Sequence, residues 1–206
     1  MNKKIYGLFI LAALLLPVTA LADTVTPAWE FTSASATNAP NYLFGEIFTA
    51  NQNIEVGYLG YYDPAVGMGS SHLVGLYDDT IGDPGYGTLF ASTTVTSASA
   101  YSSAHFLYNE ITPVELIAGD TYVIEGLSGT DAWTYAETGL VANSYITLTG
   151  ASYLSGQTSL SFNSADNSIT DYFGPDFAPV PEPSSLLLLG SGLLGLAGML
   201  RRKLAR

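Results

Sequence analysis

Three aspartates lie close together in a stretch whose residue types could bind a metal ion. Asp78, Asp79 and Asp83 fall within the run YDDTIGDPG. Carboxylate and turn carbonyl oxygens are the ligands that Ca²⁺ prefers in proteins. The spacing differs from that of an EF-hand loop and lacks its distal glutamate, so a solvated hairpin loop is the alternative. We predict no required cofactor, and the only cofactor that these residues suggest is Ca²⁺.

Two aromatic residues suggest a different chemistry, the stacking of a ring on a sugar. Trp133 and Tyr135 lie in SGTDAWTYAE, a segment that we interpret as a loop. An aromatic side chain next to a turn can expose its apolar face to a ligand. The alternative is that both rings are ordinary strand or core residues of a β-protein.

Signatures of common enzyme classes are missing. The sequence contains no Gly-x-Ser-x-Gly elbow, no HExxH helix and no phosphate-binding loop. The two histidines, His72 and His105, lie inside apparent strands, where we expect structural or surface roles rather than a metal pair. We therefore predict a protein that is not an enzyme. Since the paired carboxylates of a glycoside hydrolase meet in space and not in sequence, a polysaccharide-active enzyme is the alternative.

The charges are unevenly distributed along the 206 residues. All 18 acidic residues lie between Asp23 and Glu182, and no Lys or Arg lies between Asp23 and Leu200. The cations flank two apolar segments and are Lys3, Lys4, Arg201, Arg202, Lys203 and Arg206. By the positive-inside rule both ends start in the cytoplasm and the middle is translocated. Without cations the middle is unsuited to nucleic acid, because affinity for phosphate comes mainly from Lys and Arg.

This charge distribution also predicts how stability depends on pH. Mutual repulsion among carboxylates that have no Lys or Arg partner should raise their pKa values in the folded state. The folded state then binds more protons than the unfolded state, so stability should fall as the pH rises through the carboxylate range. Ca²⁺ or salt should restore it.

Residues 1–22 have the three parts of a secretory signal peptide. A basic start precedes the apolar run from Ile5 to Leu16, Pro17 ends that run, and Ala20-Leu21-Ala22 forms a small-x-small cleavage site. An uncleaved N-terminal membrane helix is the alternative, for which the apolar run is short.

Residues 23–173 predict one all-β domain, an antiparallel β-sandwich of jelly-roll type. Short runs with period-2 alternation are separated by glycine- and aspartate-rich turns. PVELIAGDTYVIEG predicts a hairpin with Gly119 at a turn position of positive φ. Seven runs predict strands, namely NIEVGYLGYYD, SHLVGLYDD, GTLFASTTVT, AHFLYNE, TYVIEGL, NSYITLTG and TSLSFNS. The domain has no cysteine and thus no disulfide, and it is long enough to bury a core without one.

The C-terminal region has three parts. Residues 174–183 form a proline-rich, extended linker. Residues 184–200 carry no charge and reach roughly 26 Å as a helix, close to the lower limit for a membrane span. Residues 201–206 form a basic cytoplasmic tip in which Arg201, Arg202 and Lys203 act as a stop-transfer cluster. The sequence therefore predicts a single transmembrane helix after the sandwich.

The order Pro181-Glu182-Pro183, Leu/Gly-rich helix and basic tip resembles the PEP-CTERM sorting domain of Gram-negative bacteria. The resemblance covers about the last 27 residues. It implies export through the inner membrane, transient anchoring and cutting by an exosortase at or near Val180, Pro181, Glu182 and Pro183. The released domain would then reach the cell surface or an exopolysaccharide matrix. Proteins of this family are typically associated with biofilm or floc.

These features together predict an exported, non-enzymatic surface or matrix protein that binds or organises exopolysaccharide. Its expected partners are an exosortase, the inner membrane as a precursor, and a polysaccharide. The second hypothesis is an extracellular enzyme, similar to a glycoside hydrolase, built on the same sandwich.

Overall fold

The computed structural model describes residues 25–37, 41–63, 67–103, 105–131, 133–164 and 174–181; at 34–37, 101–103 and 133–136 only the backbone is described. All of them belong to the unit Thr24–Pro181. The strands are β1 (Trp29–Glu30), β2 (Ser33–Thr37), β3 (Tyr42–Ala50), β4 (Ile54–Tyr62), β5 (His72–Asp78), β6 (Leu89–Val95), β7 (Tyr101–Ser103), β8 (Phe106–Leu116), β9 (Thr121–Leu127), β10 (Trp133–Thr138), β11 (Val141–Ala142), β12 (Ile146–Ser155) and β13 (Pro175–Pro179).

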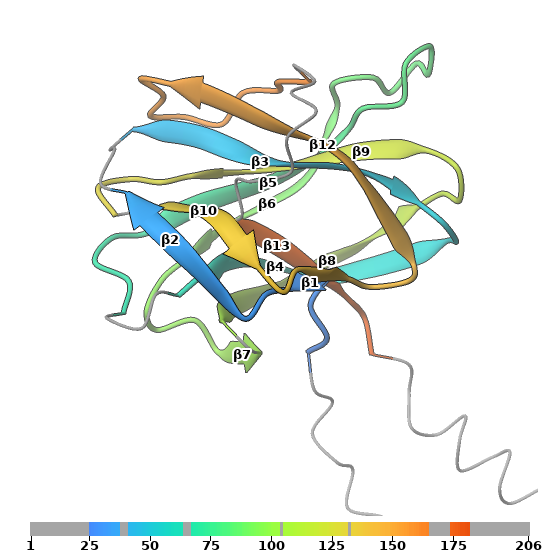
Figure 1. Cartoon of the computed structure of the whole chain (residues 1–206). Helices are drawn as coiled ribbons and strands as arrows, with labels where there is room; N and C mark the ends of the chain where they lie inside the picture. The colour runs from blue at the N-terminus through green and yellow to red at the C-terminus, as the bar shows by residue number, and fades with distance from the viewer. Residues whose placement is uncertain are drawn as a thin grey trace, which may run out of the picture. The chain divides into compact units, whose positions relative to one another are not determined.

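Two antiparallel sheets make up most of the domain. One has the order β12-β3-β9-β5-β6, the other β13-β4-β8-β7, and the pairs β1–β11 and β2–β10 add two short ribbons. Figure 1 shows the two larger sheets as stacked layers. The predicted all-β antiparallel sandwich is confirmed.

Alternating side chains of both sheets form the core between the layers. Phe48 of the five-stranded sheet meets Phe177 of the other sheet, and their rings stack with centroids 4.8 Å apart. Tyr122 packs on Phe48 from the neighbouring strand. Trp29, before the first long strand, packs edge-on against Phe177 at 5.9 Å. Each such buried ring contributes about 1.5–3 kcal/mol to stability. Burial of these rings therefore supplies the stability of a domain that has no cysteine and no disulfide.

The order of the strands in the two sheets corrects one prediction. The consecutive strands β3 and β4 pair with β9 and β8 respectively, each partner in a different sheet. The segment PVELIAGDTYVIEG is therefore a crossover between the sheets and not a hairpin. Gly119 does adopt positive φ, at 92°. Leu116 and Tyr122 both face the core across this turn, and a turn sequence does not reveal that its two arms lie in opposite layers.

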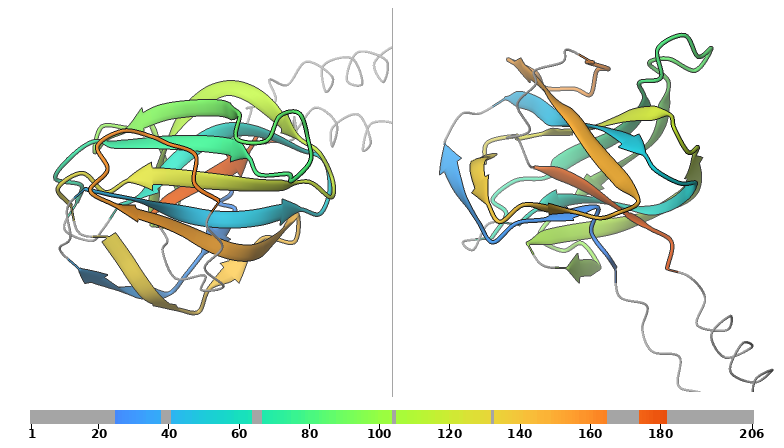
Figure 2. Two further views of the ribbon diagram at one scale, coloured as in Figure 1. Left: turned by 90° about the horizontal axis from the view of Figure 1, so that it is seen from above. Right: turned by 45° about the vertical axis from the view of Figure 1, so that its right-hand side comes forward.

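Two further segments differ from their predictions. The segment TSLSFNS at 158–164 contains no strand; Leu160 and Phe162 in it pack on Ile47, Tyr77 and Val123. This small cluster lies on the outer face of the five-stranded sheet. Figure 2, seen from above, shows the segment after β12 crossing the strands of that sheet. Alternating apolar residues here serve side-chain packing without strand pairing.

The first half of the predicted linker is a strand of the sandwich. Pro175–Pro179 form β13, which pairs antiparallel with β4. Four of its five residues are buried, among them Asp176 and Phe177. Proline lacks an N–H donor and is tolerated on an edge strand such as this one. The extended conformation was predicted correctly, but these residues belong to the domain.

Candidate ligand-binding site

A cavity of about 400 Å³ opens at one end of the outer face of the five-stranded sheet. Its lining combines aliphatic and hydroxyl-bearing side chains with one carboxylate. The lining residues are Ile47 of β3, Asp79, Thr80 and Ile81 after β5, Thr121 of β9, Thr149 of β12 and Ser164. The volume lies within the range of small-molecule sites in proteins.

One wall of the cavity is the loop between β5 and β6, which projects beyond the sheet (Figure 1). The Thr80 hydroxyl accepts a hydrogen bond from the Thr121 amide and donates to the Thr121 carbonyl, both at 3.1 Å. The Asp79 amide donates to the same carbonyl at 2.9 Å. These three bonds join the loop to the start of β9, so this wall is rigid.

The opposite wall comes from β12 and the segment that follows it. The register of β12 shifts between Leu148 and Gly150, which leaves Thr149 at a bulge, and its hydroxyl donates to the Ile47 carbonyl at 3.2 Å. Bulges of this kind redirect a side chain. Thr149 at this bulge is one of the residues that line the cavity.

Aromatic and aliphatic groups lie at the rim. The Tyr86 hydroxyl hydrogen-bonds Ser164 at 2.8 Å, and the Tyr86 ring meets Phe162 edge-on at 5.1 Å. Tyr86 remains 44% exposed, and Ile81 is 88% exposed. Apolar side chains this exposed beside a polar cavity suit a ligand that has both polar edges and apolar faces.

The three aspartates of the predicted calcium loop have different contacts in the structure. Asp78 Oδ1 accepts the Thr80 amide at 2.8 Å, and Asp83 Oδ1 accepts the Gly85 amide at 2.7 Å, so both carboxylates cap turns. Asp79 instead lines the cavity. Over the described ranges, no three His, Cys, Asp or Glu residues are grouped so that they could hold a metal ion. The calcium site stays a prediction.

The two predicted sugar-stacking residues lie in a strand and not in a loop. Trp133 pairs with Thr37 and Tyr135 with Ser35 in the β10–β2 ribbon. Their side chains are outside the described part of the structure. The serine-, glycine- and threonine-rich surroundings suggested a loop, whereas pairing with a distant strand decided otherwise.

A buried carboxyl group that the sequence reading missed lies in the middle of the same sheet face. Glu125 of the central strand β9 has no exposed surface. Its neighbours in register are Gly45 on β3 and Gly75 on β5. A β-carbon at Gly75 would lie 2.9 Å from Leu160 Cδ1, so the segment after β12 fills the space above it. Glycines inside strands often mark a close approach, and YLFGEIF and HLVGLYD carried that signal.

Burial keeps the Glu125 carboxyl protonated near neutral pH. The Ser152 hydroxyl donates to Glu125 Oε1 at 2.7 Å, and Asn163 Nδ2 donates to the Ser152 hydroxyl at 2.7 Å. Burial raises the pKa of Glu125 to about 8, and Asp79 adds to this, while the bonds from Ser152 and the Asn163 amide partly offset it. The predicted direction of the shift is right for this group, but burial rather than repulsion is the main cause.

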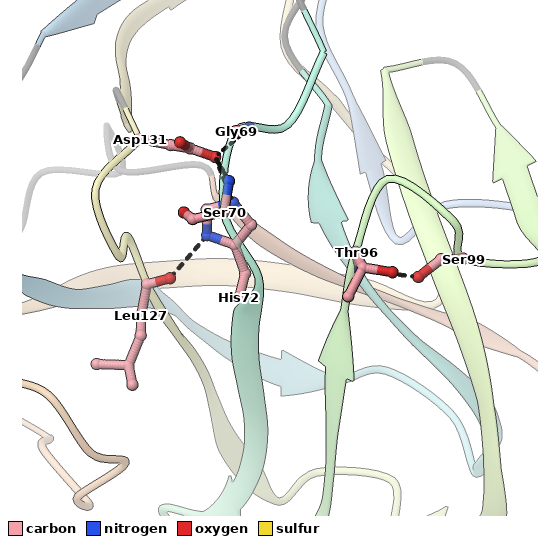
Figure 3. A network of polar contacts seen from close by, with 7 residues as sticks. All are labelled: Gly69, Ser70, His72, Thr96, Ser99, Leu127 and Asp131. Atoms are coloured by element: carbon pink, nitrogen blue, oxygen red, sulfur yellow. Dashed lines mark hydrogen bonds and ion pairs between the residues drawn. The ribbon is translucent and has the colours of Figure 1, made fainter.

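The side chains of His72 and Asp131 form a hydrogen bond at the opposite end of β5 (Figure 3). His72 Nδ1 donates to the Leu127 carbonyl at 2.9 Å, and Nε2 lies 3.0 Å from Asp131 Oδ2. Asp131 Oδ2 also accepts the amides of Gly69 and Ser70. Burial acts to raise the pKa of Asp131, but these amides and the imidazole outweigh it, so the pKa lies below its usual value. The expected structural role of His72 agrees with this arrangement.

The predicted processing residues begin where the described chain ends. The Val180 amide donates to the Glu55 carbonyl of β4 at 2.7 Å, and Pro181 is the last described residue. The other predicted parts lie outside the described residues, namely residues 1–22, Glu182, Pro183, the helix 184–200 and the cluster Arg201, Arg202 and Lys203. The described part of the chain contains no helix with the length and apolar character of a membrane span.

A scan against protein-family models matches residues 179–203 to the PEP-CTERM protein-sorting motif. The match starts at Pro179, the last residue of β13, and ends at Lys203. The chain carries a PEP-CTERM sorting motif. A search of curated proteins by sequence finds no match to the chain.

The PEP-CTERM motif confirms the resemblance drawn from Pro181-Glu182-Pro183, the apolar run and the basic tip. It indicates export by way of a membrane-anchored sorting signal and implies processing by an exosortase. The motif accounts for the tail of the protein.

Proposed function

We propose that the sandwich is delivered to the cell surface or the extracellular matrix, where its cavity binds exopolysaccharide and helps to organise a biofilm or floc. The observation that supports this function is the lining of the cavity. Thr80, Thr121 and Thr149 contribute hydroxyl oxygens that can accept hydrogen bonds, Asp79 contributes a carboxylate, and Ile47 an apolar surface. A sugar ring has hydroxyls at its edge and C–H groups on its faces, so it needs both kinds of surface.

The ligand is neutral or positively charged. Asp79 lines the cavity, and the carboxylates of Asp78, Asp83 and Asp120 are close enough to raise the pKa of nearby Tyr122, for which burial is the main cause. No Lys or Arg occurs between Asp23 and Leu200 to offset them. A uronic-acid polymer would be repelled at this site, whereas a neutral or amine-bearing chain would not.

Binding by the processed protein, purified from the cell envelope, tests the function. The probes are exopolysaccharide isolated from the producing cells, a neutral glucan and a uronic-acid polymer, each with calcium and with chelator. We expect Asp79→Asn and Ile81→Ala to weaken binding about tenfold each, which corresponds to about 1.4 kcal/mol. Glu110→Gln and Val141→Ala, both exposed and outside the cavity, are the matched controls.

An enzyme acting on extracellular polysaccharide is the second candidate, and one observation favours it. Glu125 has its pKa raised to about 8, and Asp79 lies close enough to contribute to that shift. A carboxyl group with a raised pKa near a second carboxyl group is a feature of glycosidase active sites. Against it, Glu125 has no exposed surface, and it is not among the residues that line the cavity.

Product analysis separates the two candidates. Release of reducing ends that stops in Glu125→Gln would establish the enzyme. Retained binding without release supports the binding function. If neither binding nor release occurs with any probe, the cavity has no role toward polysaccharide.

A further inference from the structure

The domain holds the chain up to the residue before the Pro-Glu-Pro tripeptide. β13 pairs with β4, and the Val180 amide continues that pairing by donating to the Glu55 carbonyl at 2.7 Å. Val180 and Pro181 are both half-buried. The PEP-CTERM match begins at Pro179, so the sorting motif and the sandwich share residues. No free linker lies between the sandwich and Pro181.

Gly57 makes room for Val180. A β-carbon at Gly57 would lie 2.7 Å from Val180 Cγ2 and 3.5 Å from Val180 Cα. Gly57 also has no partner in the register of β4 with either neighbouring strand. Val56 and Tyr58 on either side of it pair with Pro179 and Ala178 of β13, and the pairing with β8 shifts at the same place. The Val180 side chain therefore occupies a recess that only glycine leaves open.

β13 is anchored strongly enough to serve as a fixed base for this recess. Phe177 is fully buried between Phe48 and Trp29. Asp176 is fully buried as well; it accepts the Tyr108 hydroxyl at 2.5 Å and the Ala28 amide at 3.2 Å. Truncation of a buried phenylalanine costs about 3–5 kcal/mol, so β13 does not detach without much of the core.

We infer that Gly57 and Val180 position the sorting motif for the exosortase. The contact between Gly57 and Val180 holds Pro181 at a fixed place on the edge of the folded domain, and cutting occurs on the C-terminal side of Pro181. The released protein therefore keeps β13, Val180 and Pro181. Gly57 and Val180 act through the placement of Pro181 and are positioning residues.

The full-length precursor, expressed in the producing cell, tests this inference. Gly57→Ala pushes Val180 out of its recess, and misplacement of a reacting group by about 1 Å can cost up to 10²-fold in rate. We expect processing at least about tenfold slower, or products with several C-termini, by intact-mass measurement and pulse-chase. Gly57→Ala combined with Val180→Ala removes the clashing methyl groups and should restore one product at the normal rate.

A Gly-Ser-Gly-Ser insertion between Val180 and Pro181 covers the case in which Gly57→Ala does not fold. The insertion leaves β13 and the recess intact but frees the motif from the domain. We expect the same slow or heterogeneous processing. Uniform cutting of this insertion variant at the wild-type rate would overturn the inference, as would any wild-type product that ends before Val180. Either result would mean that the motif alone sets the cut.

Discussion

The Ser152 hydroxyl of β12 donates a hydrogen bond to the Glu125 carboxyl of β9 at 2.7 Å. The two side chains meet across β3, whose residue in register with both of them is Gly45. A larger residue at that position would keep the two side chains apart. The contact secures the segment after β12, because Asn163 donates in turn to the Ser152 hydroxyl. Since Ser164 of that segment lines the cavity, Glu125 supports the candidate site from below.

Replacement of Glu125 by glutamine should make the protein more stable at alkaline pH. The pKa of Glu125 is about 8 in the folded protein against 4.5 for an ordinary glutamate, so the folded state binds the proton more tightly. Stability from this group is fully present below about pH 4.5 and is lost as the pH rises through about 8, by roughly 5 kcal/mol at about 1.4 kcal/mol per pKa unit. The glutamine side chain of the variant remains neutral throughout.

Thermal unfolding from pH 5 to pH 9 measures this difference. The wild type and Glu125→Gln should have similar melting temperatures near pH 5 and diverge steadily between about pH 5 and pH 8, with Glu110→Gln following the wild type. Parallel curves for all three proteins would contradict the assigned pKa. Asp176, whose pKa burial raises well above its usual value, adds a similar decline to every variant and so cancels in the comparison.

Asp131→Asn should destabilise the loop that precedes β5. The carboxylate accepts two backbone amides and faces the imidazole of His72, and an asparagine oxygen cannot replace its charge. Loss of a hydrogen bond to a charged group costs about 1.5–3 kcal/mol. Denaturant unfolding at neutral pH measures the loss, with Asp83→Asn, an exposed aspartate that accepts one amide of its own turn, as the control. Equal stabilities of the two variants would show that the pair contributes nothing.

The pH dependence of Asp131 has the opposite sign to that of Glu125. Its pKa in the folded protein lies below the usual 3.8. The stability that it contributes is therefore present above about pH 4 and is lost as the pH falls through the folded pKa. The gap between the wild type and Asp131→Asn should close in acid.

Glu55→Gln should stabilise the four-stranded sheet slightly. Glu55 and Glu115 lie directly opposite each other on β4 and β8, and like charges in such a pair are destabilising. Removing one charge should add about 0.2–1 kcal/mol at low salt and nothing at high salt, where the repulsion is screened. Glu110→Gln is matched to it, because Glu110 lies opposite Tyr58 on the same pair of strands. A gain that persists at high salt would point to a cause other than repulsion.

The sequence by itself determined the features that depend on composition and local pattern. The period-2 runs predicted most of the strands, Gly119 predicted its positive φ, and the tripartite tail predicted the sorting motif. The distribution of Lys and Arg needed no structure at all. Each of these depends on residues that are close together along the chain.

Only the tertiary structure decided which segments meet. It made PVELIAGDTYVIEG a crossover, left TSLSFNS without a strand, paired β10 with β2, and brought Pro175–Pro179 into the sandwich. It also brought Glu125 beside Ser152, and His72 beside Asp131. These outcomes depend on burial and on partners that are distant in sequence, because a strand pairs wherever the whole chain buries the most apolar surface. Local pattern predicts that a segment is extended, and the packed core selects its neighbour.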